Sequence, residues 1–149
     1  MIDLHSHVLP GIDDGPASLE GSIELARAAR AAGTRTLVAT PHVSWRHPND
    51  ADTIHRLVDE LNARLREEGL GLVVLPGSEI AMSRLLDIES QELQKLGLGG
   101  GPWLLVEPPF AQAVAGLEIL LLQLQSHGHQ IVLAHPERCQ AFHRDRAIL

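Results

Sequence analysis

The first fifteen residues, Met1–Gly15 (MIDLHSHVLPGIDDG), decide the fold, and His5 and His7 are their central feature. An apolar-rich run leads directly into these two histidines. If that run is a strand, both imidazoles point to the same face, because side chains repeat every second residue. The proline, glycines and aspartates that follow predict a turn directly after the pair. The pair therefore lies at the C-terminal end of a strand, where parallel α/β folds build their sites.

Strands and helices alternate along the rest of the chain. This alternation predicts an α/β fold with a parallel sheet and right-handed crossovers. Apolar residues at intervals of three and four mark the helices, and glycines mark their ends. Beyond the first strand, the predicted strands are residues 34–40, 70–75, 103–106 and 130–134, and the predicted helices are 17–32 (with Ser18 as N-cap), 49–68, part of 82–96, 111–126 and the start of the C-terminal remainder.

The composition indicates one globular domain over residues 1–149 and excludes several classes of partner. The formal net charge is −7 and 44% of the residues are apolar, which is ordinary for a globular protein. Without a basic stripe, and with only 3% aromatic residues, no nucleic-acid surface is expected. We see no signal peptide and no apolar run of spanning length, and the single cysteine fits a reducing compartment. We therefore predict a cytoplasmic protein without membrane insertion.

A residue with metal-ligand chemistry ends or follows each of the five predicted strands. These strand ends converge on one face of a parallel barrel, where burying carboxylates without compensation costs on the order of several kcal/mol. Divalent cations remove that cost. Mixed histidine and carboxylate ligands suit Zn, Mn or Fe, and a carboxylate can bridge two ions, as two-metal phosphoester cleavage requires. The candidate ligands are His5, His7, His42, Glu79, Glu107 and His135.

Each candidate ligand also has an ordinary structural interpretation. A lone HxH pair is weak evidence, a histidine after a strand is usually a loop or cap residue, and a carboxylate there can favour a helix start. Only the joint pattern favours metal binding. His47 lies in a loop at the same rim, so a role in the site stays open. Cys139 and Arg144 have no glycine between them to form a phosphate loop, so we set thiol-based phosphatase chemistry aside.

Five motifs, in order along the whole chain, carry a resemblance to a known family. They are MIDLHSHVLPGIDDG (1–15), ATPH (39–42), PGSEI (76–80), LVEPP (105–109) and AHPER (134–138). Together they resemble the PHP superfamily (polymerase and histidinol phosphatase). They look most like its branch of bacterial manganese-dependent tyrosine-protein phosphatases of capsular and exopolysaccharide synthesis, the CpsB/YwqE type. The two aspartates after the HxH motif and the HPER string favour that branch.

The resemblance implies a fold, a cofactor and a substrate. The implied fold is a distorted seven-stranded parallel (β/α) barrel with two or three divalent metal ions at its C-terminal rim, Mn²⁺ first and Fe or Zn as alternatives. Arg138 would bind the substrate phosphate, a role that suits the planar fork of its guanidinium. The implied substrate is a phosphotyrosine protein, such as a bacterial tyrosine kinase of polysaccharide synthesis. The implied metal ligands are His5, His7, Glu79, Glu107 and His135, with His42 in the same cluster.

The sequence departs from the family pattern near its C-terminus. The family's last metal motif, an Asp-x-His on a late strand, has no counterpart here, so we expect about five strands and an incomplete barrel. Open strand edges would then favour self-association. Two alternatives to a protein phosphatase stay open. One is a truncated, non-catalytic or assembly-dependent protein that binds metal or phosphate, and the other is a phosphatase of small phosphomonoesters such as histidinol phosphate.

Overall fold

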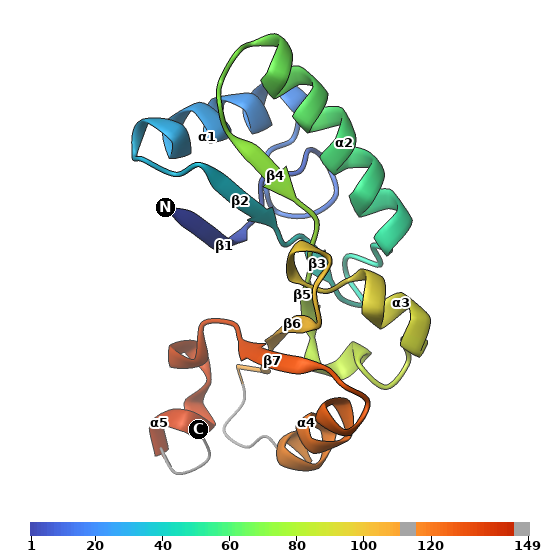
Figure 1. The fold of residues 1–149 in the computed structure, drawn as a ribbon. Helices are drawn as coiled ribbons and strands as arrows, with labels where there is room; N and C mark the ends of the chain where they lie inside the picture. The colour runs from blue at the N-terminus through green and yellow to red at the C-terminus, as the bar shows by residue number, and fades with distance from the viewer. Residues whose placement is uncertain (111–115, 145–149) are drawn as a thin grey trace.

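The computed structural model describes residues 1–110 and 116–144 and has the predicted α/β character. Strands and helices alternate along most of the chain, and α1 and α2 lie together beside β2 and β4 (Figure 1). The elements are β1 (Ile2–Ser6), α1 (Leu19–Ala31), β2 (Thr36–Ala39), β3 (His42–Val43), α2 (Ala51–Glu67), β4 (Val73–Leu75), β5 (Glu79–Ala81), α3 (Ser90–Lys95), β6 (Trp103–Glu107), α4 (Leu117–Ser126), β7 (Gln130–Leu133) and α5 (Gln140–Arg144).

The described strands form two sheets, in the orders β1-β2-β4 and β3-β5-β6-β7. Every pair of neighbouring strands is parallel, as predicted. The chain passes from the first sheet to the second at two places, between β2 and β3 and between β4 and β5. Pro41 interrupts the first passage and Pro76 the second, because proline lacks the N–H that a sheet ladder needs. The described residues therefore contain seven strands where five are predicted: β3 and β5 are short additional strands that lie just beyond the predicted strands 34–40 and 70–75.

The second passage also requires a glycine. A Cβ atom on Gly77 would lie 2.9 Å from Val38 Cγ1 and 3.2 Å from the carbonyl oxygen of Ala39. The two crossing segments therefore approach each other as closely as their backbones allow. The expected barrel is not established by this arrangement: among residues 1–110 and 116–144 no strand pairing joins β1 to β7.

The two long N-terminal helices begin where polar side chains cap them. The Ser18 hydroxyl accepts a hydrogen bond from the Gly21 N–H, as predicted, and Asp50 accepts one from the Thr53 N–H. A cap of this kind satisfies a backbone donor that the first helical turn leaves open. The apolar stripe of α2 is buried against the sheet, and its members are Ile54, Leu57, Leu61 and Leu65.

The structure confirms that residues 82–96 are helical in part, and it describes the predicted helix 111–126 from residue 116 onward. The first segment is divided into a short 3₁₀ turn, Met82–Arg84, and helix α3, because residues 85–89 leave the helical path between them. Helix α4 begins at Leu117, and residues 111–115 lie outside the described residues. Within the described part of the chain, no helix combines the length and apolar character needed to cross a membrane.

Candidate metal centre

The six candidate ligands meet in one cluster, each at or close to the end of a strand. His42 and Glu79 begin β3 and β5 and are register partners in the sheet. Glu107 ends β6, and His135 follows β7 by two residues. His5 and His7 share a face as predicted, since their Nε2 atoms are 3.4 Å apart. Val8 and Leu9 are completely buried directly after the pair, so apolar packing fixes the turn that presents it.

Glu79 lies at the centre of this cluster and is only 1% exposed. Its Oε2 atom is 3.2 Å from His5 Nε2, 3.1 Å from His7 Nε2 and 3.3 Å from His42 Nδ1. Its Oε1 atom is 2.7 Å from His135 Nε2. None of these contacts has the alignment of a hydrogen bond, so both carboxylate oxygens are buried without one. A cation among these atoms would satisfy them all, and the donor set therefore fits a bound metal.

Glu79 belongs to two groups of three atoms that could each hold an ion. One group is His5, His7 and Glu79, and the other is His42, Glu79 and Glu107. Glu107 reaches the cluster through Oε2, 3.8 Å from His42 Nδ1, and through Oε1, 3.6 Å from His135 Nε2. A carboxylate shared by two groups is what a bridged pair of ions requires.

Asp14 is a potential ligand that the sequence analysis missed. Its Oδ1 atom lies 3.4 Å from His7 Nδ1 and 3.7 Å from His42 Nε2, and the three residues form a third possible metal group. The sequence did contain a signal, because Asp14 follows the HxH motif within the same loop. From the sequence, the aspartates of this loop are interpreted as turn residues and as part of the family motif, not as metal ligands.

Asp13 supports the site from behind. Its buried carboxylate faces three N–H groups: Oδ2 lies 2.7 Å from His7 Nδ1 and 3.0 Å from the backbone nitrogen of His42, and Oδ1 accepts from Gly15 N–H at 2.9 Å. The contact with Nδ1 turns Nε2 of His7 toward Glu79. This is the arrangement by which a carboxylate orients a metal-binding histidine.

Asn49 also connects the loop after β1 with the start of β3. Its side-chain amide donates hydrogen bonds to the carbonyl oxygens of Ile12, at 3.0 Å, and His42, at 2.8 Å. The loop after β1 and the start of β3 are therefore held together by both Asp13 and Asn49. The spacing between His7 and His42 is fixed by the chain itself.

The charges of the cluster shift the pKa values of its members. Burial lowers the pKa of His7, but the contact with Asp13 and the negative charges of Asp13 and Glu79 outweigh it and raise the value to about 10. Burial raises the pKa of Glu79, and the interactions with His5 and His7 reverse that effect and hold it well below its usual range. Without metal, the centre is therefore a carboxylate paired with a His7 imidazolium at neutral pH.

The remaining candidates differ in how they relate to the cluster. The His47 ring stacks on His42 with centroids 5.7 Å apart but belongs to none of the three groups. Arg138 is exposed in the turn Pro136–Arg138 after His135. Within the described residues its side chain has no hydrogen bond or ion pair, so the structure leaves its predicted phosphate role open.

The parallel α/β fold and the cluster of histidines and carboxylates define a PHP-type fold with a candidate metal centre. More narrowly, the chain belongs to the CpsB/CapC family of capsular polysaccharide synthesis, whose sequence profile matches residues 1–148. The resemblance seen in the five motifs is thereby confirmed.

Relatives of known name agree with this assignment. The chain is 38% identical over 150 residues to the tyrosine-protein phosphatase YwqE of Bacillus subtilis (strain 168), covering 100% of this chain and 59% of that protein. It is 33% identical over 144 residues to the putative tyrosine-protein phosphatase CapC of Staphylococcus aureus, covering 95% and 56%. The chain thus spans less than two thirds of the length of these relatives.

A solved structure shares the fold. It comes from crystallographic work on YwqE from Bacillus subtilis and CpsB from Streptococcus pneumoniae, described there as metal-dependent tyrosine phosphatases. The TM-score is 0.85 at 35% sequence identity, and the match covers 99% of this chain and 60% of that one.

Proposed function

We propose that this chain binds two or three divalent metal ions and hydrolyses phosphotyrosine in proteins. The observation that carries the metal site is the buried Glu79 carboxylate, which has four imidazoles around it and no hydrogen bond. The phosphatase activity is supported by the names of the relatives. Mn²⁺ is the ion we expect, with Fe or Zn as alternatives that the same ligand types accept.

Each residue of the cluster has a proposed part in the reaction. Glu79 would hold the ions together with the remaining residues of the two groups to which it belongs. When bound, the ions supply Lewis acidity toward a phosphoryl oxygen and toward the attacking water. Asp13 orients His7, and Arg138 contacts the equatorial oxygens of the phosphoryl group through its fork of donors. The single cysteine, Cys139, is buried and takes no part. The proposed ligands are His5, His7, Asp14, His42, Glu79, Glu107 and His135.

The proposal also places the protein in the cytoplasm, with a tyrosine kinase of polysaccharide synthesis as substrate. Membership in a capsular polysaccharide family supports the second point. A metal-binding protein without activity and a phosphatase of small phosphomonoesters are the competing outcomes of the test below.

The test combines metal analysis with turnover. Purified protein should contain divalent metal and, with Mn²⁺, should release phosphate from a phosphotyrosine peptide faster than from histidinol phosphate. Replacing His5 and His7 together by alanine should remove at least one ion and the activity. Equal metal content in the wild type and the double variant would overturn the ligand assignment. Metal without turnover would leave a binding protein.

A further inference from the structure

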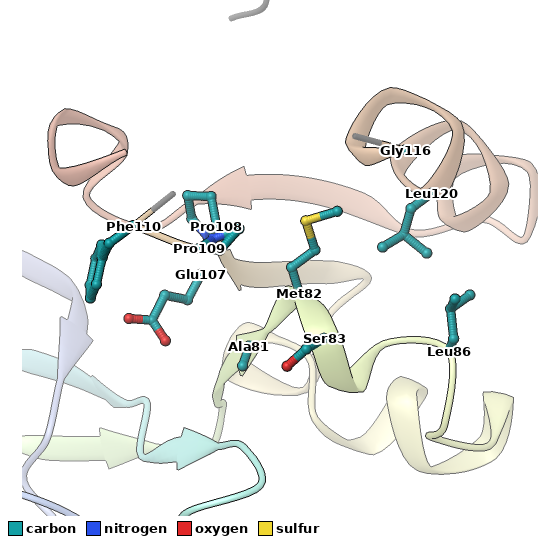
Figure 2. A pocket seen from close by; sticks show the side chains of 10 residues that line it. All are labelled: Ala81, Met82, Ser83, Leu86, Glu107, Pro108, Pro109, Phe110, Gly116 and Leu120. Carbon is teal, nitrogen blue, oxygen red and sulfur yellow. The ribbon is translucent and has the colours of Figure 1, made fainter. Parts of the chain in front are cut away.

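An apolar pocket opens directly beside the metal centre. Its volume is about 510 Å³, within the range of pockets that hold ligands of drug size. Glu107 belongs both to the wall of this pocket and to a metal group. Figure 2 shows the pocket between the segments that follow β5 and β6, with the start of α4 on its far side. Its lining is Ala81, Met82, Ser83, Leu86, Glu107, Pro108, Pro109, Phe110, Gly116 and Leu120.

The chemistry of the lining selects what can enter. Glu107 is the sole charged group among the lining residues, so a negatively charged guest would lose its hydration without gaining a partner. Pro108 and Pro109 have no N–H and cannot donate hydrogen bonds to the backbone of an extended peptide. Met82 offers a flexible thioether that adapts to apolar guests of different shape. These properties favour an apolar side chain over a polar one and over main-chain pairing.

Exposed side chains at the rim of the pocket also favour an apolar guest. Leu86 is 77% exposed and Phe110 is 53% exposed, although both border the pocket. Large apolar side chains gathered at a hollow next to a candidate active site are typical of a binding surface.

We propose that this pocket binds an apolar side chain next to the phosphorylated residue of a peptide substrate. The inference rests on the proposed phosphatase function, which puts the phosphoryl group at the metal centre and leaves the organic part of the ester beside it. Glu107 links the two places, so a peptide anchored by its phosphate has its neighbouring residues at the pocket. The volume exceeds what one aromatic ring fills, so room remains for a second side chain.

The experiment compares binding of peptides that the enzyme cannot hydrolyse. Each peptide carries a phosphonate analogue of phosphotyrosine, with leucine or serine on either side, and its affinity is measured by fluorescence anisotropy in the presence of Mn²⁺. At one flank, leucine should improve affinity about tenfold or more over serine, the gain expected from burying one such side chain. Leu86→Asp should reduce this preference to near one.

The matched control is Leu122→Asp. Leu122 is also an exposed leucine, 57% exposed, and it lies on α4 outside the pocket, so its replacement should leave the leucine preference intact. Equal affinities for the leucine and serine peptides in the wild type, or an equal loss of preference in both variants, would overturn the proposal. Turnover of a small aryl phosphate is measured separately. If leucine preference persists without turnover, the phosphatase function fails and the pocket assignment stands.

Discussion

His7 and His135 both place an imidazole against Glu79, yet the protein holds them differently. The second ring nitrogen of His7 contacts Asp13, and that carboxylate also accepts from the backbone of His42. The second ring nitrogen of His135 is buried without a hydrogen-bond partner among the described residues. The backbone of His135 has a φ of +25°, a value that few non-glycine residues adopt and that costs conformational free energy.

The same difference extends to the surroundings of each histidine. The loop after His7 is anchored by the completely buried Val8 and Leu9, which belong to the larger hydrophobic core. The turn after His135 packs on a smaller apolar cluster of Leu117, Cys139, Ala141 and Phe142. The N-terminal ligands are therefore preorganised by the chain, whereas the C-terminal ligand depends more on what binds at the centre.

The largest expected effect comes from Glu79→Gln, which removes the charge that both sides of the cluster share. The glutamine has nearly the same size but cannot bridge two cations as a carboxylate does. We expect bound metal to fall below one ion per chain after dialysis against metal-free buffer, measured by elemental analysis. Full metal content in this variant would mean that the His7 and His135 sides of the cluster bind metal independently. Glu79 would then not be the ligand that the two sides share.

The next effect concerns the support behind His7. Asparagine at position 13 has one accepting oxygen where Asp13 has two, so one N–H group would face an amide NH₂ instead. Asp13→Asn should weaken metal binding about 10- to 100-fold, the usual cost of losing a carboxylate behind a metal-binding histidine. Chelator competition measures this constant.

The control for Asp13→Asn is Asp50→Ala at the N-terminus of α2. Loss of this helix cap should lower the free energy of unfolding by about 1 kcal/mol without changing the metal affinity, because Asp50 contacts none of the ligands. If both variants weaken metal binding equally, Asp13 is merely structural and the N-terminal side is not specially preorganised.

The sequence could predict much of this site because chain direction and strand periodicity decide where strand ends lie. Six candidate ligands come together from five predicted strands, although these span 131 residues of sequence from His5 to His135 counting both ends. The role of Asp13 could not be predicted, because aspartate is equally common in a turn for purely local reasons. Its contact with the His42 backbone depends on how two distant segments pack.

The two additional strands and the pocket could not be predicted from the sequence either. β3 and β5 begin just after Pro41 and Pro76, yet a proline at a strand end is equally consistent with a plain turn. The pocket is assembled from loops after β5 and β6 and from α4, so it appears only once those elements are placed in space. Hydrophobic periodicity predicts which face of a helix or strand is buried. It does not predict which cavity remains between three elements after they have packed.

Proton release provides a third test of the comparison. Because the pKa of His7 is raised to about 10, metal binding at neutral pH must displace its proton from Nε2. Titration calorimetry in buffers of different ionisation enthalpy should therefore show release of about one proton or more per chain, and metal affinity should rise about tenfold per pH unit below that pKa. Absence of proton release at pH 7 would contradict the paired state of His7.

The stability of the metal-free protein should follow the same charges. The raised pKa of His7 contributes stability fully below its ordinary value of 6.5, and this contribution is lost as pH rises toward about 10. The lowered pKa of Glu79 contributes stability above its ordinary value of 4.5, which is lost as pH falls. Both contributions are complete between those two values, so thermal unfolding with EDTA should show its highest midpoint there. A midpoint that rises steadily to pH 9 would contradict this assignment.

The smallest expected effect belongs to Arg138, which shares a turn with His135 but is exposed to solvent. A guanidinium cannot ligate a metal, so Arg138→Ala should leave the metal content unchanged. The KM for a phosphotyrosine peptide, or the inhibition constant of phosphate, should rise about tenfold, which is the effect of losing one charge-assisted contact. Arg138→Lys should restore only part of this, because an ammonium is a point charge and cannot bind two phosphate oxygens side by side. Loss of metal in Arg138→Ala would show instead that the turn helps to position His135. In that case the turn would position His135 much as Asp13 positions His7, and the two histidines would differ only in how strongly they are held.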